Sequence, residues 1–472
     1  MKRVLEIFRE ICAIPHGSGD MERISDYCVS FAKENGLWVY RDDARNVIVK
    51  KAGSKGYENS PAVILQGHLD MVCQKEETIA INFETDGITT EILGDELFAK
   101  GTTLGADNGI GVAMILAILE RGDLFHPPLE AVFTVDEEIG LLGAGKLDFS
   151  LLRANKMINL DTENDDVITV SCAGGSTFSM QYPLSREKKT GTEIVISLCG
   201  LAGGHSGVEI HKGRVNANLL AGRFLNHMRA EEDFFLLSLS GGDKDNAIPR
   251  SVKIRLLSEN AKSFCERAQR YFDVIQKEIR AREPDFSAAI EILSCGEKNV
   301  FSPKDTEQII TLLALLPDGV ISMSREIENL VETSLNLGIL RTEEDRVILS
   351  FGLRSNKASA LSGLEEKLFA IADLFSCRAK KSGAYPPWEF RPDSPMREVY
   401  LSVYREETKK EAKTEAIHAG LECGIFASSL EDLDCISIGP NIFDPHTTGE
   451  RLSLSSADLV YRLVQKTLEK CR

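Results

Sequence analysis

The sequence lacks any apolar run of the roughly 18 residues that a membrane-spanning helix requires, which predicts a protein without a membrane span. The first fifteen residues, MKRVLEIFREICAIP, carry Glu6, Arg9 and Glu10 within their apolar pattern. A secretory signal needs an uninterrupted apolar segment, so we expect an amphipathic helix here instead of a signal peptide.

Paired cysteine motifs are also missing. The 11 cysteines are scattered along the chain, their number is odd, and none forms a CxxC pair. This pattern predicts no disulfide framework and favours reduced thiols in a cytoplasmic protein.

The chain has no excess of positive charge: 55 Lys and Arg face 72 Asp and Glu, a net charge of −17. An acidic surface repels phosphate backbones and anionic lipid, so we expect neither nucleic-acid nor membrane partners. A P-loop is incomplete as well. Residues 140–147, GLLGAGKL, end in Leu147 where a Ser or Thr is needed to hold magnesium, which argues against a nucleotide site.

What the chain does have is length and apolar material. Its 472 residues are 43% hydrophobic, enough for two or three domains. In roughly the first 165 residues, short apolar runs at Ala62–Leu65, Ala131–Val135 and Lys156–Leu160 alternate with helical patterns. One of these, Gly109–Glu120, has an apolar stripe. The alternation predicts an α/β fold with a mixed, largely parallel sheet flanked by helices.

From about residue 185 the pattern changes to βαββαβ, the order of a ferredoxin-like unit. We place its strands and helices at Glu193–Leu198, Val215–Ala230, Phe234–Ser240, Ser251–Leu257, Lys262–Arg282 and Ala288–Leu293. A weaker second copy follows between residues 308 and 381. The predicted domains are therefore a discontinuous catalytic domain, residues 1–184 and 386–472, and an inserted, doubled α+β domain, residues 185–385.

Polar clusters follow the three predicted strands of the first domain. His68 and Asp70 come after the first, Asp136-Glu137-Glu138 after the second, and Asp161 after the third. The carboxyl ends of parallel strands meet at one edge, so these clusters should converge. Taken singly, each has a simpler explanation, since acidic residues also favour helix N-termini.

Two further residues belong to this group. Asp107 lies before the Gly109–Glu120 helix, and His446 lies in the turn-rich segment NIFDPHTTGE. Carboxylates and imidazoles gathered in one crevice need cations to offset their repulsion and desolvation. Zinc accepts both kinds of ligand, whereas calcium and magnesium sites rarely use imidazole. One Asp bridging two ions would leave three protein ligands on each and room for a shared water, which is a catalytic arrangement.

At these residues the chain resembles the M20 metallopeptidases, specifically the aminoacyl-histidine (Xaa-His) or cytosol non-specific dipeptidases. The matching segments are QGHLDMV, LGADNGIGVA, HPPLEAVFTVDEEIGLLGA, INLDTE, GGHSGVEIHKGRVNA, NAIPR, HAGLECGIF and FDPHTTGERLS. They follow the family order over nearly the whole chain.

The resemblance implies two Zn²⁺ per chain, with Co²⁺ or Mn²⁺ as substitutes. It assigns the ligands as two sets that share Asp107: His68, Asp107 and Asp161, and Asp107, Glu138 and His446. It also makes Glu137 the general base that activates a metal-bridging water, and Asp70 the partner that orients His68.

The inserted segment corresponds to the family's lid domain. His205 matches the residue that stabilises the oxyanion of the tetrahedral intermediate. Asn246 and Arg354 match positions that hold the substrate's backbone and carboxylate, and His418 and Glu422 match a loop near the substrate pocket. The sequence does not fix whether His205 acts in its own chain or across a homodimer.

The predicted function is hydrolysis of unblocked dipeptides, with a preference for a C-terminal histidine and broad specificity that includes β-alanyl-histidine. The alternative within enzymes is another M20 amidohydrolase, such as an N-acyl-amino-acid deacylase. A silent binding protein is a third interpretation, and Glu137 argues against it because a binder has no use for a base.

Overall fold

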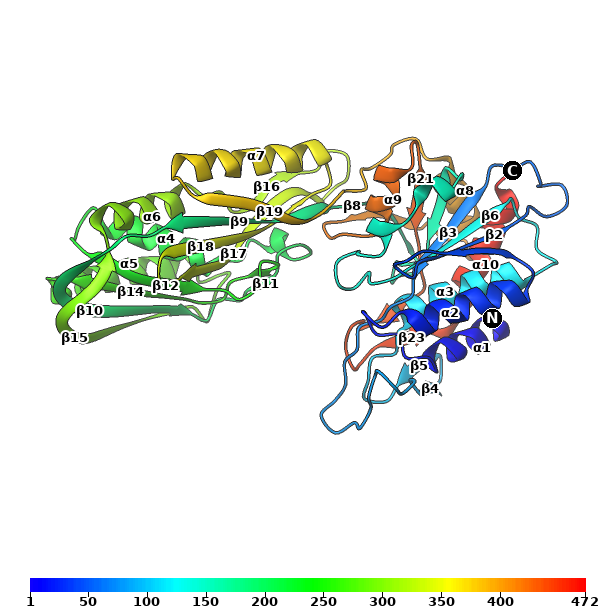
Figure 1. The fold of residues 1–472 in the computed structure, drawn as a ribbon, viewed down its shortest axis with the longest axis horizontal. Helices are drawn as coiled ribbons and strands as arrows, with labels where there is room; N and C mark the ends of the chain where they lie inside the picture. Colours follow the sequence, from blue (N-terminus) through cyan, green and yellow to red (C-terminus); the bar gives the residue numbers. More distant parts are fainter. The chain divides into compact units, whose positions relative to one another are not determined.

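The computed structural model describes all 472 residues, and the chain divides into two compact units (Figure 1). The first unit consists of Met1–Cys172, Trp388–Ala416 and Leu421–Arg472, and the second of Ala173–Pro387 and Ile417–Gly420. The segment predicted to be inserted, residues 185–385, lies within the second unit. No helix is both long enough and apolar enough to cross a bilayer.

An eight-stranded mixed sheet forms the centre of the first unit, in the order β1-β2-β6-β3-β7-β21-β8-β20. Its four parallel strands are β6 (Leu129–Thr134), β3 (Val63–His68), β7 (Lys156–Asn159) and β21 (Asp434–Ser437). The flanking strands are β1 (Trp38–Arg41), β2 (Val47–Lys51), β8 (Val167–Cys172) and β20 (Lys413–Ile417). The pairs β1–β2, β2–β6 and β21–β8 are antiparallel. The predicted mixed α/β sheet is confirmed, and its parallel part is limited to the middle.

Every residue of β3 and β6 is buried. A parallel strand covered on both faces needs an apolar run instead of an alternating pattern, which explains why these segments were recognisable in the sequence. The first unit's helices are α1 (Lys2–Cys12), α2 (Glu22–Glu34), α3 (Ala106–Glu120), α8 (Pro395–Thr408), α9 (Cys423–Ser429) and α10 (Leu454–Lys470).

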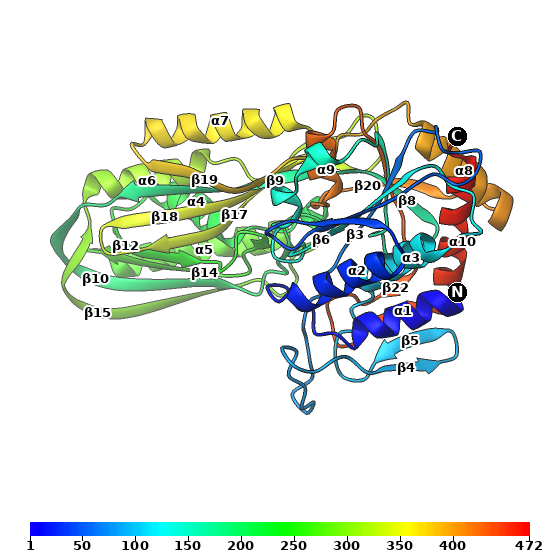
Figure 2. The same cartoon turned by 45° about the vertical axis from the view of Figure 1, so that its right-hand side comes forward.

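The predicted apolar stripe on α3 is wrong, because this helix is buried on all sides from Asn108 to Leu119. It packs against β3 and also against α1 and α10 (Figure 2). A helix between a sheet and other helices has no solvent face, so its sequence is apolar all round.

The second unit is built on an antiparallel sheet in the order β15-β10-β14-β12-β17-β18-β9-β19, to which β16 (Gly319–Met323) adds by pairing with β17. The first half contains β10 (Arg186–Cys199), α4 (Ala217–Met228), β12 (Phe235–Gly241), β14 (Val252–Ser258), α5 (Ala261–Ile279) and β15 (Ser287–Phe301). This is the predicted βαββαβ order. Its strands lie side by side as fourth, first, third and second, so the first ferredoxin-like copy is confirmed.

The second copy begins earlier in the chain than predicted. Its first strand is β9 (Gly174–Pro183), which precedes the whole first copy, and it continues with α6 (Pro303–Leu315), β17 (Val331–Thr342), β18 (Arg346–Ser355), α7 (Ala358–Leu374) and β19 (Arg378–Tyr385). The order β19-β9-β18-β17 repeats that of the first half. One copy is therefore inserted after the first strand of the other, a nesting that a linear search for βαββαβ misses.

Two small sheets carry loops that matter below. The strands β22 (Ile442–Phe443), β23 (Arg451–Ser453), β5 (Glu96–Ala99) and β4 (Thr90–Leu93) form one, and the β22–β23 connection holds His446. In the second unit, β11 (Gly204–His205) pairs with β13 (Ala247–Ile248).

Candidate metal centre

Three side chains meet at the carboxyl ends of the parallel strands. His68 is the last residue of β3, Asp161 lies just beyond β7, and Asp107 lies at the start of α3. The Nε2 atom of His68 is 3.1 Å from Asp107 Oδ1 and 3.3 Å from Asp161 Oδ1. These residues converge because parallel strands end at a common edge.

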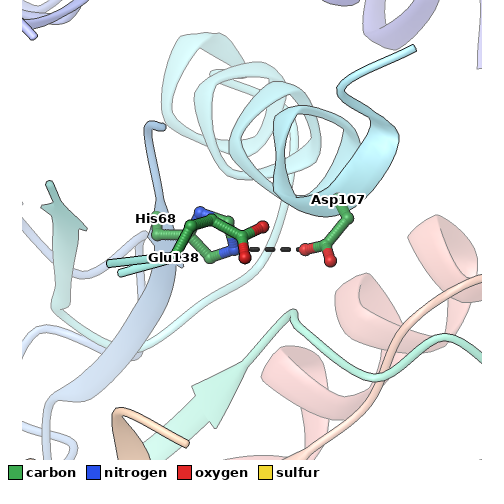
Figure 3. A group of neighbouring side chains, drawn as sticks. All are labelled: His68, Asp107 and Glu138. Carbon is green, nitrogen blue, oxygen red and sulfur yellow. Dashed lines mark hydrogen bonds and ion pairs between the residues drawn. The ribbon is translucent and has the colours of Figure 1, made fainter. Parts of the chain in front are cut away.

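Asp107 turns its second oxygen to another pair of side chains. Its Oδ2 is 3.1 Å from His446 Nε2, and that nitrogen is 2.9 Å from Glu138 Oε1. Ligand atoms of His68, Asp107 and Glu138 all lie within 4.8 Å of one another (Figure 3). Asp107 thus stands between two pairs, each made of one imidazole and one carboxylate.

The charges of this group show what it could bind. Burial raises the pKa of Asp161 to about 6, and hydrogen bonds with Asp107 and Glu138 raise the pKa of His446 to about 11. Burial opposes ionisation of Asp107, yet hydrogen bonds with His446 and His68 hold its pKa below the ordinary value. These shifts show that the surrounding carboxylates favour positive charge at the imidazoles. A divalent cation could supply it instead, so the donor set fits a metal centre.

Asp70 does not share a strand face with His68, because β3 ends at His68. His68 Nδ1 donates to the main-chain oxygen of Asp70 at 2.9 Å, while the nearest carboxylate oxygen is 3.5 Å away. The carboxylate itself accepts from the N–H groups of Glu137 (2.9 Å) and Glu138 (3.2 Å) and from the Ser18 hydroxyl (2.8 Å). Asp70 therefore leaves Nε2 as the outward-facing acceptor of His68 and also fixes the segment after β6.

Glu137 follows β6 in a turn and not in a helix, so the helix N-terminus interpretation of this acidic pair is wrong. Burial raises the pKa of the Glu137 carboxyl well above its ordinary value; the charge of His68 opposes this shift, and those of Asp161 and Glu422 add to it. A carboxyl group with a raised pKa is a stronger base than an ordinary carboxylate.

In the second unit, His205 is held in a defined tautomer. Its Nδ1 accepts hydrogen bonds from the backbone N–H groups of Gly207 (3.1 Å) and Val208 (3.2 Å), which places the ring proton on Nε2. Burial lowers the pKa of His205, and the charge of Arg354 lowers it further. The imidazole is therefore a neutral N–H donor.

Other residues predicted for the lid gather around His205. A Cβ placed on Gly207 would lie 2.7 Å from the His418 carbonyl oxygen, 2.9 Å from the His205 ring and 3.0 Å from Arg354 Nε, so these three surround one small residue. Asn246 is exposed next to them, and its carbonyl accepts from the N–H of Ser206 at 2.9 Å.

Two predicted substrate contacts are buried instead. His418 is 6% exposed and hydrogen-bonds Ser334 (2.7 Å) and Asn356 (3.2 Å). Glu422 in the first unit has no exposed surface, and its Oε2 accepts from Gln66 (2.5 Å) and Thr134 (2.6 Å). Both side chains are therefore hydrogen-bonded within their own units, and the substrate contact proposed for each stays a prediction.

Sequence reasoning missed one residue in each unit that contacts a predicted site residue. Tyr385 accepts a hydrogen bond from Arg354 Nη1 at 3.0 Å. Glu450 accepts hydrogen bonds from the backbone that carries Asp107. Neither stands out by spacing or composition, although Glu450 lies inside the segment that contains His446.

Comparison with known proteins gives the family of the chain. The family model of the M20 peptidase dimerisation domain matches residues 196–278. The cytosol non-specific dipeptidase of Escherichia coli strain K12 is 36% identical over 469 residues, which cover 98% of this chain and 96% of that protein. The aminoacylhistidine dipeptidase of Vibrio alginolyticus superimposes with a TM-score of 0.92 at 37% identity, over 100% of this chain and 96% of that one.

A more distant structure shares the fold. The aminopeptidase PepT of Bacillus cereus gives a TM-score of 0.57 at 15% identity, over 99% of this chain and 98% of that one. Because more than a third of the sequence is shared with dipeptidases over nearly its full length, the chain belongs to the M20 metallopeptidases and is a peptide-bond hydrolase of the dipeptidase type.

Proposed function

We propose that the enzyme hydrolyses unblocked dipeptides with two zinc ions held in the first unit. In this proposal one ion is bound by His68, Asp107 and Asp161, and the other by Asp107, Glu138 and His446. The observation that carries it is the position of Asp107, whose two oxygens face two separate imidazole–carboxylate pairs at 3.1 Å from each imidazole.

The choice of zinc is chemical. Zinc binds both imidazole nitrogen and carboxylate oxygen, and three protein ligands per ion are typical of its catalytic sites. Cobalt or manganese could replace it, because the same donors suit several divalent metals. When bound, the ions would supply Lewis acidity and lower the pKa of water.

Glu137 is the proposed general base. It follows Asp136, whose carboxylate accepts from the Gly19 N–H at 2.7 Å, and its own N–H is bound by Asp70, so its backbone is fixed on both sides. With its raised pKa, the carboxyl group can take a proton from the attacking water and deliver it to the leaving amine.

The second unit is proposed as the lid, and the first as the catalytic domain. His205 would donate its Nε2 proton to the developing oxyanion, a role that suits a neutral imidazole whose other nitrogen is already bound. Arg354, oriented by Tyr385, would pair with the C-terminal carboxylate of the dipeptide, and Asn246 with its backbone. We assign His418 and Glu422 structural roles. His418 holds Ser334 and Asn356 in the second unit, and Glu422 holds Gln66 and Thr134 on β3 and β6 of the first.

Specificity for Xaa-His dipeptides, with broad tolerance, is proposed from the name of the Vibrio relative, and a cytoplasmic location from that of the Escherichia coli relative. The match to a dimerisation domain supports a homodimer. In this chain β12 pairs with β14 on one side and with β17 on the other, so it is not a free sheet edge that a second copy could extend. Light scattering after gel filtration would give the oligomeric state.

The test is a comparison of initial rates on β-Ala-His, Gly-His, Ala-Leu and N-acetyl-Ala-Leu, with metal-free protein reconstituted with zinc. We expect hydrolysis only of the three unblocked dipeptides, and the histidine-to-leucine ratio measures the preference for a C-terminal histidine. Cleavage of the acetylated compound alone would replace this proposal with a deacylase.

A further inference from the structure

Glu450 is a buried carboxylate whose hydrogen bonds all go to one stretch of backbone. It is 2% exposed. Its Oε2 accepts from the N–H groups of Leu104 (2.7 Å) and Gly105 (3.1 Å), and its Oε1 from those of Ala106 (2.8 Å) and Asp107 (3.3 Å). Four consecutive peptide groups therefore point at a single side chain.

Such a run of N–H groups is an anion-binding concavity. It comes before the regular part of α3, because the backbone at Asp107 and Asn108 is not helical. Gly105 makes the curvature possible with φ of 72°, and a Cβ there would lie 2.8 Å from Met71 Sδ. No side chain caps this helix end from its own N-cap residue. Glu450 supplies the anion from a distant part of the chain.

The same residue ties together two segments of the metal centre. Glu450 closes the loop between β22 and β23, and the N–H of Glu450 donates to the Thr447 carbonyl within that loop at 3.2 Å. His446 sits in this loop with a side chain 47% exposed. Its Nε2 reaches Asp107 at 3.1 Å across a sequence separation of 339 residues. The carboxylate of Glu450 thus connects the backbone of Asp107 to the loop of His446.

We propose that Glu450 is a positioning residue that sets Asp107 against His446 and so controls binding of the second cation, the one assigned to Asp107, Glu138 and His446. This inference rests on the proposed function for the ligand assignment. In this proposal Glu450 contacts neither the substrate nor a metal ion. The first cation depends less on Glu450, because His68 and Asp161 are placed by β3 and β7.

The experiment is a titration of metal-free protein with zinc against a competing chelator, comparing wild type with Glu450→Gln. The amide keeps the shape but turns an N–H₂ group toward two of the four backbone donors. We expect two zinc sites in wild type, and in E450Q a loss of about 10–100-fold in affinity at the second site, the range typical for partners of metal ligands. Loss at the first site should be smaller.

A matched control is Glu130→Gln. Glu130 is also buried in the first unit, and its Oε2 accepts from the N–H groups of Arg153 (2.9 Å) and Ala154 (3.0 Å), at the opposite end of β6. E130Q should lose thermal stability but keep both zinc affinities, which separates positioning from general destabilisation. If E450Q does not fold, Glu450→Asp keeps the charge on a shorter side chain and should show an intermediate loss at the second site.

The outcomes separate the two proposals. Wild type that binds two zinc ions, together with folded E450Q or E450D that binds both as tightly, would overturn the role of Glu450 alone. Equal loss in E130Q would do the same, because the effect would then be general. Wild type that binds fewer than two ions would remove both the dizinc proposal and this inference.

Discussion

Lowering the pH is expected to destabilise the second unit through His418. The ring is buried and hydrogen-bonds Asn356 Oδ1 through Nδ1 and Ser334 Oγ through Nε2, an arrangement that a neutral imidazole satisfies in full. Burial lowers the pKa of His418 to about 3, and the nearby charges of Arg354 and His205 contribute. Protonation would therefore place a cation in an apolar interior beside another cation.

The size of the effect follows from the two pKa values. An unfolded histidine has a pKa of about 6.5, so between about pH 6.5 and 3 the unfolded state holds a proton that the folded state lacks. The contribution of His418 to stability is fully present above that range and is lost as the pH falls through it. The loss approaches about 1.4 kcal/mol per pH unit and reaches about 2 kcal/mol at pH 5.

Hydrogen exchange of β17 and β18, corrected for the chemical exchange rate, would measure local stability between about pH 7.5 and 5. His418→Gln removes the titrating group, so its stability should fall less steeply than that of wild type. His227→Gln, at a partly exposed histidine of the same unit, should follow wild type. Equal slopes in wild type and H418Q would refute the reasoning, because other titrating groups contribute to both proteins alike.

Two further predictions concern catalysis. Glu137→Gln should lower kcat by about 10²–10⁴-fold while both zinc ions stay bound, because in our proposal this residue moves protons and holds no metal. Metal analysis alongside the rate measurements checks this prediction, and loss of zinc from the variant would contradict it. His205→Ala should lower kcat by about 10²–10³-fold with a smaller change in KM, as expected for an oxyanion donor. The control His211→Ala, at an exposed residue of the same unit, should change neither kcat nor KM. A change confined to KM in the His205 variant would instead assign His205 to ground-state binding of the substrate.

Local sequence patterns predicted much of the first unit's central sheet. The apolar runs of β3, β6 and β7 were recognisable because buried parallel strands need them, and the polar residues after each run marked the functional edge of the sheet. The first ferredoxin-like copy was recognisable for the same kind of reason, since its six main elements follow one another in sequence with only the short strands β11 and β13 and one helical turn between them. The second copy was only partly visible, because β9 is separated from the rest of it by the whole first copy.

Contacts between segments far apart in the sequence could not be predicted from local patterns. Nothing in the local pattern joins Asp107 to His446, and only the family resemblance suggested that they meet. The sequence also did not predict the hydrogen-bond partners. Asp70 binds the His68 ring through its main-chain oxygen, while its carboxylate binds the backbone N–H groups of Glu137 and Glu138. His418 and Glu422 form hydrogen bonds within their own units.

By itself, then, the sequence determined the residue types of the candidate metal centre and the strands at whose ends they lie, because burial and strand geometry act over a few neighbouring residues. Only the tertiary structure decided that Asp107 faces two imidazoles and that Glu450 holds its backbone in place. Those contacts depend on how loops more than 300 residues apart are brought together, and no short-range preference encodes that distance.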